Sequence, residues 1–141
     1  MKEAPPALLT IQVLEALHAV ESRLEAALEP LGLSLAKLGV LSKLVAAGEP
    51  LPLGTLAERC ACVRSNITQL VDRLQAEKLV VRSDDPRDRR SVRAELTAEG
   101  RSRQAAGLEA LYGAERALVA RIPRRHREAF LESLQALRAQ D

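Results

Sequence analysis

The sequence predicts a mainly α-helical domain that carries one small β-hairpin. Most of the chain repeats apolar residues near the 3.6-residue period of an α-helix. Only the segments 79–82 and 91–96 have the character of strands, and the second of them alternates apolar with charged residues. The length of 141 residues is that of a single domain, which is large enough to bury a core without disulfides or a metal.

Two helices are expected in the first third of the chain, over 7–29 and 35–47. Pro30 is expected to end the first helix, because the residue before a proline avoids the α-helical region. Ser34 is a good N-cap for the second helix, and Gly48 suits the position after its end.

A stiff turn at 49–53, which holds two prolines, leads into a short third helix over 53–59. A fourth helix is expected over 64–77, because its apolar residues recur three and four positions apart. These residues are Ile67, Leu70, Val71 and Leu74.

The two strands are expected to be joined by a polar loop over 83–90, which makes a hairpin with a charged tip. Thr97 is expected to cap a long fifth helix that runs to about residue 121, where Pro123 breaks it. A sixth helix is expected over 124–139, with an apolar stripe that should face inward. The stripe consists of Phe130, Leu134 and Leu137.

Composition excludes several classes of protein. Hydrophobic residues make up 47% of the chain and charged residues 28%, which is typical of a globular protein rather than a disordered one. No apolar run reaches the roughly 18–20 residues of a membrane span, and the N-terminus lacks the apolar core of an export signal, so no membrane contact and a cytoplasmic location are expected. Tyr112 and Phe130 are the only aromatic residues, too few for a surface that stacks bases. The sequence has no nucleophile–base pair, phosphate loop or metal motif, and so predicts neither an enzyme nor a cofactor.

A short helix, a turn, a second helix and then a charged hairpin form the pattern of a winged helix-turn-helix. In that fold the second helix of the pair enters the major groove and presents its outer face to base edges. The outer face here carries residue types that read bases. They are Arg64, Ser65, Asn66, Gln69 and Arg73, with Thr68 at the margin. A solvated polar helix face is the alternative interpretation.

The hairpin tip concentrates arginines, which suit the negative potential of a narrow minor groove. It contains Arg87, Asp88, Arg89 and Arg90. Asp88 lies two residues before Arg90 and is expected to hold its guanidinium in place. The alternative is a surface hairpin with internal ion pairs that contribute little.

The chain resembles the MarR family of bacterial transcriptional regulators (multiple antibiotic resistance regulators), closely over about 32–101 and more loosely over the flanks. The run Asp88-Arg89-Arg90-Ser91 and the later Leu96-Thr97-Ala98-Glu99-Gly100 are similar to the wing signature of that family. Similar to its two reading helices are Leu56-Ala57-Glu58-Arg59, Ile67-Thr68 and Val71-Asp72-Arg73-Leu74. The chain departs from the family at Lys37, Val63 and Lys78, where Gln, Ser and Gly are usual.

This resemblance implies a homodimer that is joined through 1–33 and 100–141 and whose lobes, 34–99, bind double-stranded DNA. It also implies a pseudo-palindromic operator, usually repression, and a small ligand between the dimerisation helices and the lobe. In the family's wing, Arg90 would be the DNA-contacting arginine and Asp88 its orienting partner. A dimeric architectural or interaction protein that binds DNA without sequence preference is the alternative.

Three further groups of residues have open interpretations. Cys60 and Cys62 are interpreted as small buried residues, with a thiol redox switch as the alternative and no metal site. His18 and Tyr112 are candidate contacts for a small ligand. The basic cluster around Pro123 is interpreted as a solvated corner, and alternatively as a phosphate contact or an ion pair in a dimer interface. Its members are Arg121, Arg124, Arg125 and Arg127.

Overall fold

The computed structural model describes residues 8–60 and 64–140, and of Arg64 and Ser65 it describes the backbone alone. The α-helices are α1 (Leu9–Leu28), α2 (Leu35–Ala47), α3 (Leu53–Arg59), α4 (Arg64–Ala76), α5 (Ala98–Val119) and α6 (Arg124–Arg138). A 3₁₀ turn, η1 (Glu29–Leu31), follows α1. The strands are β1 (Leu51–Pro52), β2 (Val80–Asp85) and β3 (Asp88–Leu96). The predicted fold class is confirmed.

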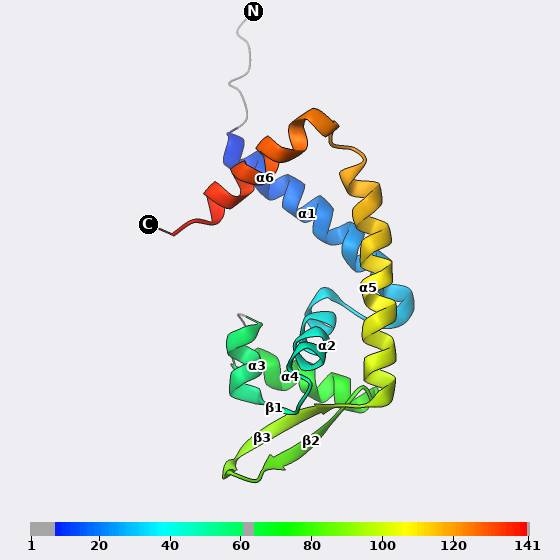
Figure 1. Cartoon of the computed structure of the whole chain (residues 1–141), viewed down its shortest axis with the longest axis vertical. Helices are drawn as coiled ribbons and strands as arrows, with labels where there is room; N and C mark the ends of the chain where they lie inside the picture. The colour runs from blue at the N-terminus through cyan, green and yellow to red at the C-terminus, as the bar shows by residue number, and fades with distance from the viewer. Residues whose placement is uncertain (1–7, 61–63, 141) are drawn as a thin grey trace, which may run out of the picture.

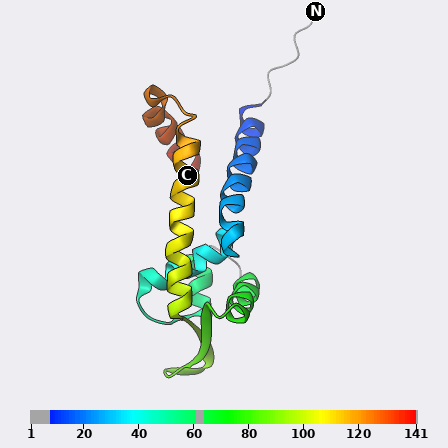
Figure 2. The ribbon, with the colours of Figure 1, turned by 90° about the vertical axis from the view of Figure 1, so that its right-hand side faces the viewer.

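The elements divide into a lobe and an arm (Figure 1). The lobe holds α2, α3, α4 and the sheet, and the arm holds α1, α6 and the C-terminal half of α5. Figure 2 shows that α1 and α6 lie apart, although they overlap in Figure 1. Every residue from Leu8 to Arg23 and from Glu128 to Gln140 is exposed. The prediction that Phe130, Leu134 and Leu137 face inward is therefore wrong for the single chain, in which they are 47%, 38% and 64% exposed. A helical stripe predicts a buried face but not which molecule covers it.

The helix ends follow from local chemistry. The Ser34 hydroxyl accepts a hydrogen bond from the Lys37 amide at 3.1 Å, and Gly48 closes α2 in the left-handed region at φ 67°. Both predictions for this helix are confirmed. The first helix ends slightly early, because Pro30 sits within the 3₁₀ turn that follows Leu28.

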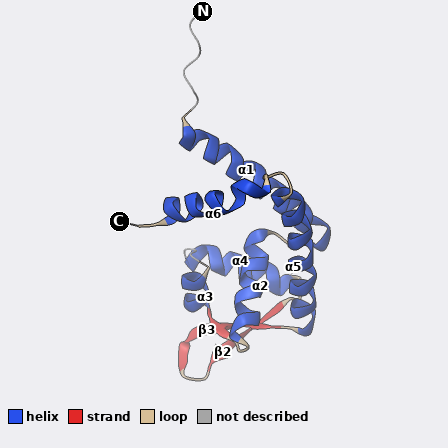
Figure 3. Cartoon of the chain, turned by 45° about the horizontal axis from the view of Figure 1, so that its top comes forward, coloured by secondary structure: helices blue, strands red, loops and turns tan. Residues whose placement is uncertain are grey.

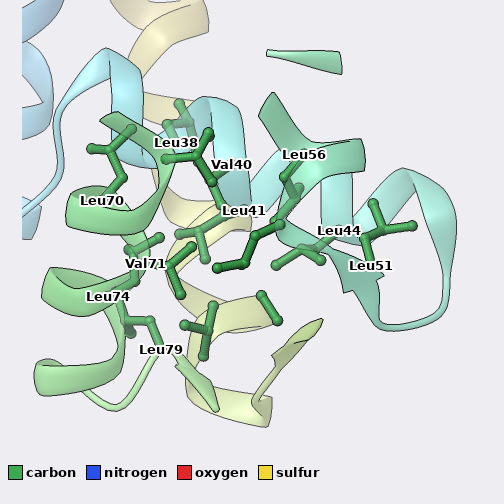
Figure 4. Packing of buried hydrophobic residues seen from close by; sticks show 14 of the residues in the cluster. Leu38, Val40, Leu41, Leu44, Leu51, Leu56, Leu70, Val71, Leu74 and Leu79 are labelled. Carbon is green, nitrogen blue, oxygen red and sulfur yellow. The ribbon is translucent and has the colours of Figure 1, made fainter. Parts of the chain in front are cut away.

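The core lies inside the lobe and is almost wholly aliphatic (Figure 4). Leu41 and Leu44 of α2 are at most 2% exposed and share this core with Val71 and Leu74 of α4, both at 0%. Leu56 of α3 closes it from another side. Each such side chain contributes about 1.5–3 kcal/mol by its burial, so the inner faces of the helices position α4 on a rigid base.

The sheet has three antiparallel strands in the order β1-β3-β2. Figure 3 shows the hairpin of β2 and β3 in red. The strand β1 was not predicted: Leu51 pairs with Ala94 where the sequence indicates only a turn. Pro52 lacks an N–H and is tolerated because β1 lies at the edge of the sheet. The predicted loop 83–90 is also wrong in extent, since β2 and β3 continue through it and leave only Pro86 and Arg87 as the turn.

The start of α5 packs tightly against Leu79, the residue just before the hairpin's first strand. Thr97 caps α5 as predicted, accepting a hydrogen bond from the Gly100 amide at 2.9 Å. The amide of Thr97 donates to the Leu79 carbonyl at 3.1 Å. A β-carbon on Gly100 would lie 2.0 Å from that carbonyl oxygen, so only glycine fits there.

Within the described ranges, no single helix combines the length and the apolar character of a membrane span. One bent pair, Leu9–Leu31 with Leu35–Ala47 at 71°, meets that test by length and composition only.

Candidate DNA-binding surface

The two faces of α4 differ as the sequence predicts. Ile67, Val71 and Leu74 are 0% exposed and Leu70 is 7% exposed, so this stripe belongs to the core. On the opposite side Asn66, Gln69 and Arg73 are exposed, and Thr68 is half-buried. The side chains of Arg64 and Ser65, also predicted for this face, lie outside what the structure describes. The exposed set offers two amides and a guanidinium, which pair with adenine and guanine edges respectively.

The helix α4 is tied to the wing, here the hairpin of β2 and β3, through Arg82 of β2. The guanidinium of Arg82 forms an ion pair with the Asp72 carboxylate, and its other amino group donates to the Thr68 carbonyl at 3.3 Å. Because the two contacts lie one helical turn apart, they fix both the position and the rotation of α4 relative to β2. Sequence reasoning missed this contact, since a helix residue and a strand residue ten positions apart give no periodic signal.

The wing tip presents its charged side chains to solvent. Arg87, Asp88, Arg89 and Arg90 are all exposed. The Asp88 carboxylate accepts a hydrogen bond from the backbone amide of Arg90 at 3.0 Å, whereas the sequence prediction joined it to the guanidinium. The contact shapes the backbone at the tip and leaves the Arg90 side chain exposed for another partner.

The C-terminus of α4 closes with a Schellman motif. The amide of Leu79 donates to the Leu74 carbonyl at 2.9 Å, and the amide of Lys78 donates to the Gln75 carbonyl at 3.0 Å. Lys78 occupies the left-handed position of this motif at φ 64°. This conformation favours glycine, which explains why the family usually has glycine where this chain has lysine.

Lys37 of α2 also departs from the family pattern. It connects α2 with the end of α4 and with the turn that follows η1. Its ammonium group contacts the Glu77 carboxylate at 2.6 Å, just after the end of α4. The same group donates to the Gly32 carbonyl at 3.3 Å, in the elbow that follows η1. Lys37 thus connects the base of the arm to the end of the reading helix.

The remaining candidates do not come together as one site. Cys60 is half-buried and packs against the core, while Cys62 lies outside the described residues. His18 on α1 and Tyr112 on α5 are both exposed. Among the described residues, no group of three or more His, Cys, Asp or Glu side chains could hold a metal ion.

The basic corner between α5 and α6 is mostly exposed. Arg121, Arg124 and Arg125 are exposed, whereas Arg127 is half-buried and donates to the Ile122 carbonyl at 3.0 Å. Arg127 therefore closes the corner, while the other three arginines face solvent.

Comparison with known proteins places this geometry in a family. The family model described as MarR family matches residues 31–91, which hold α2, α3, α4 and most of the hairpin. This part of the chain belongs to the MarR family.

The curated relatives of the chain include the HTH-type transcriptional repressor MdtR of Bacillus subtilis. It is 33% identical over 102 residues, which are 71% of this chain and 65% of MdtR. The uncharacterized HTH-type transcriptional regulator YkoM of the same organism is 36% identical over 69 residues, 49% of this chain and 44% of YkoM. The chain thus spans between about half and two thirds of the length of these curated relatives.

Solved structures extend the likeness over nearly the whole chain. The transcriptional repressor CouR of Rhodococcus jostii RHA1, in a structure bound to a 23-mer DNA duplex, is 26% identical. The match covers 98% of this chain and all of that chain, with a TM-score of 0.84. The arm is therefore part of the shared fold, although the family model stops at residue 91.

Proposed function

We propose that this protein is a sequence-specific, DNA-binding transcriptional regulator that acts as a homodimer on a pseudo-palindromic operator. The observation that carries the proposal is the exposed face of α4 with Asn66, Gln69 and Arg73, which Arg82 fixes beside the arginine-bearing wing. Amide side chains read base edges but add no charge against phosphate, so their presence favours a sequence-specific reader over an architectural protein.

The homodimer is supported by the apolar surface of the arm. On α1, Ile11, Leu14 and Leu17 are 45–58% exposed. On α6, Phe130 and Leu131 are 47% and 56% exposed. Two amphipathic helices that both expose several large apolar side chains are far from the usual surface of a monomer. A second copy would cover both faces with matching helices and would set two α4 helices at a fixed spacing.

Repression and a small-molecule effector belong to the same proposal. The relative MdtR is described as a repressor, and CouR is a repressor with a structure bound to p-coumaroyl-CoA. A ligand between arm and lobe would change the lobe spacing by favouring one of two conformations. Such a regulator works where the chromosome is, in keeping with the cytoplasmic location that the sequence predicts.

The first test is selection of bound duplexes from a random DNA library. An enriched inverted repeat, with half-sites about one helical turn apart, is the expected result. Binding that falls steeply with salt but enriches no sequence would replace the proposal with the architectural alternative.

The wing is tested on the selected duplex with Arg90→Ala. We expect about a tenfold loss of affinity at matched salt, as for the loss of one base-contacting or groove-contacting arginine. Arg101→Ala, an exposed arginine on α5 outside the wing, is the matched control. Equal affinities of the two variants would contradict the role of Arg90.

The dimer is tested by sedimentation of the wild-type chain and of Leu14→Asp. The wild type should sediment as a dimer at micromolar concentration, and the variant as a monomer, because a charge would be buried in the interface. A monomeric wild type would refute the homodimer.

A further inference from the structure

A hollow of about 460 Å³ separates the wing from α3. Its walls come from three places: the segment before α3, α3 itself, and the wing from the turn into β3. Figure 1 shows the wing passing beneath α3 at this end of the lobe. The hollow lies on the lobe, away from the arm, so it differs from the ligand position between arm and lobe.

Three guanidinium groups line this hollow. Arg59 comes from α3, Arg87 from the turn of the wing and Arg93 from β3. Within the described ranges none of the three takes part in an ion pair. Two carboxylates, Glu49 and Asp85, also lie on the lining, and Asp85 is already bonded to the backbone amide of Arg87 at 2.9 Å. The three guanidinium groups thus outnumber the two carboxylates, and the lining of the hollow keeps an excess of one positive charge.

Arg93 is the least satisfied of the three. Its Nε atom is buried without a hydrogen-bond partner in the part of the chain that the structure describes. One amino group of the same guanidinium reaches the Ser83 hydroxyl only at 3.5 Å, the limit for a hydrogen bond. A buried donor that lacks an acceptor destabilises a protein, and a bound anion is one way in which such a donor is satisfied.

We propose that this hollow is an oxyanion-binding site that takes one carboxylate or phosphate group among Arg59, Arg87 and Arg93. A planar guanidinium binds two oxygens of such a group at once, which a lysine does not. The Thr55 hydroxyl on the same lining supplies a further donor. The anion comes either from a free small molecule or from the DNA backbone, and in either case it joins the wing to α3.

The site is tested first without DNA, by calorimetric titration with inorganic phosphate and with benzoate at constant ionic strength. Wild-type protein should bind one of the two saturably, and chloride at the same ionic strength should not compete. Arg93→Met and Arg59→Gln should each lower the affinity at least tenfold. Arg59 is exposed, so Arg59→Gln keeps the test valid if the change at Arg93 disturbs folding. Arg101→Gln, outside the hollow, should bind as the wild type does.

The second experiment measures how DNA affinity depends on salt. If a backbone phosphate occupies the hollow, Arg59→Gln and Arg93→Met should each reduce the logarithmic salt slope by about 1, and phosphate should compete with DNA. Saturable binding of a free anion with an unchanged slope assigns the site to a small molecule.

Absence of saturable anion binding together with an unchanged salt slope overturns the proposal. The experiment with DNA rests on the proposed function, whereas the calorimetric titration does not. A wild-type chain that binds no DNA therefore refutes the proposed function, and the calorimetry alone then decides whether the oxyanion site exists.

Discussion

Gly100→Ala adds a single methyl group at the point where α5 meets the wing. The new β-carbon would lie 2.0 Å from the Leu79 carbonyl oxygen and 2.9 Å from Cδ1 of Leu96. The Leu79 oxygen belongs to the backbone and is held by the Thr97 amide at 3.1 Å, so it cannot rotate away as a side chain would. Relief requires α5 to move by roughly 1 Å, since carbon and oxygen atoms do not approach much below 3 Å.

The cost follows from what that movement breaks. A shift of this size separates the amide and hydroxyl of Thr97 from the Leu79 carbonyl, and each lost hydrogen bond costs about 1 kcal/mol. Forcing a methyl group into a packed contact destabilises the fold by about a further 1–3 kcal/mol. The higher helix propensity of alanine offsets up to about 1 kcal/mol of that loss. We expect the free energy of unfolding to fall by about 2–4 kcal/mol, a large part of the stability of such a domain.

Urea unfolding followed by circular dichroism measures this change. Gly39→Ala is the matched control, because Gly39 lies within α2 and no atom comes within 4 Å of its added β-carbon. The control should raise the free energy of unfolding by about 0.5–1 kcal/mol. The two proteins must be compared at one concentration, since the proposed dimer would add to the free energy of unfolding. A loss below 1 kcal/mol for Gly100→Ala would refute the close approach of α5 to Leu79.

Three other predictions concern the contacts that position α4. Lys78→Gly should raise the free energy of unfolding by about 1 kcal/mol in the same assay, because it removes a non-glycine residue from φ 64°, and a loss would contradict that conformation. In a double-mutant cycle, the losses in free energy of unfolding caused by Lys37→Met and by Glu77→Gln should differ from strict additivity by about 0.5–1 kcal/mol. Strictly additive losses would show that the 2.6 Å contact does not stabilise the fold. Arg82→Met should weaken binding to the selected duplex at least tenfold while the dimer persists in sedimentation, because α4 loses its contacts with β2; unchanged affinity would contradict the positioning role of Arg82.

The helices and their ends were predictable because their causes are local. Ser34, Gly48 and Thr97 act on the amides and carbonyls of their own turn, so a few residues of sequence determine each end. The buried stripe of α4 is similarly visible in the spacing of its apolar residues. The exposed face is what remains once that stripe is assigned, which is why the spacing alone places Asn66 and Gln69 correctly.

The sheet was less predictable because its partners are distant in sequence. The strand β1 has two residues and gains its identity only from pairing with Ala94 and Arg93, more than forty positions away. The outer part of the wing does not alternate apolar with polar residues, because its side chains face solvent. The sequence therefore gives no sign that the two strands stay paired up to the tip. The ion pair of Arg82 and Asp72 depends on this longer hairpin, so it was missed for the same reason.

The arm shows a different limit of sequence reasoning. The sequence identifies an apolar stripe on α6, yet in the described chain Phe130 and Leu137 of that stripe are 47% and 64% exposed. Periodicity reports that a face avoids water, and it is silent on whether the same chain or another one covers that face. In the lobe the answer is the same chain, because α2, α3 and α4 converge on one core. In the arm α1 and α6 lie apart, and in the proposed homodimer a second copy would cover both of their apolar faces at once.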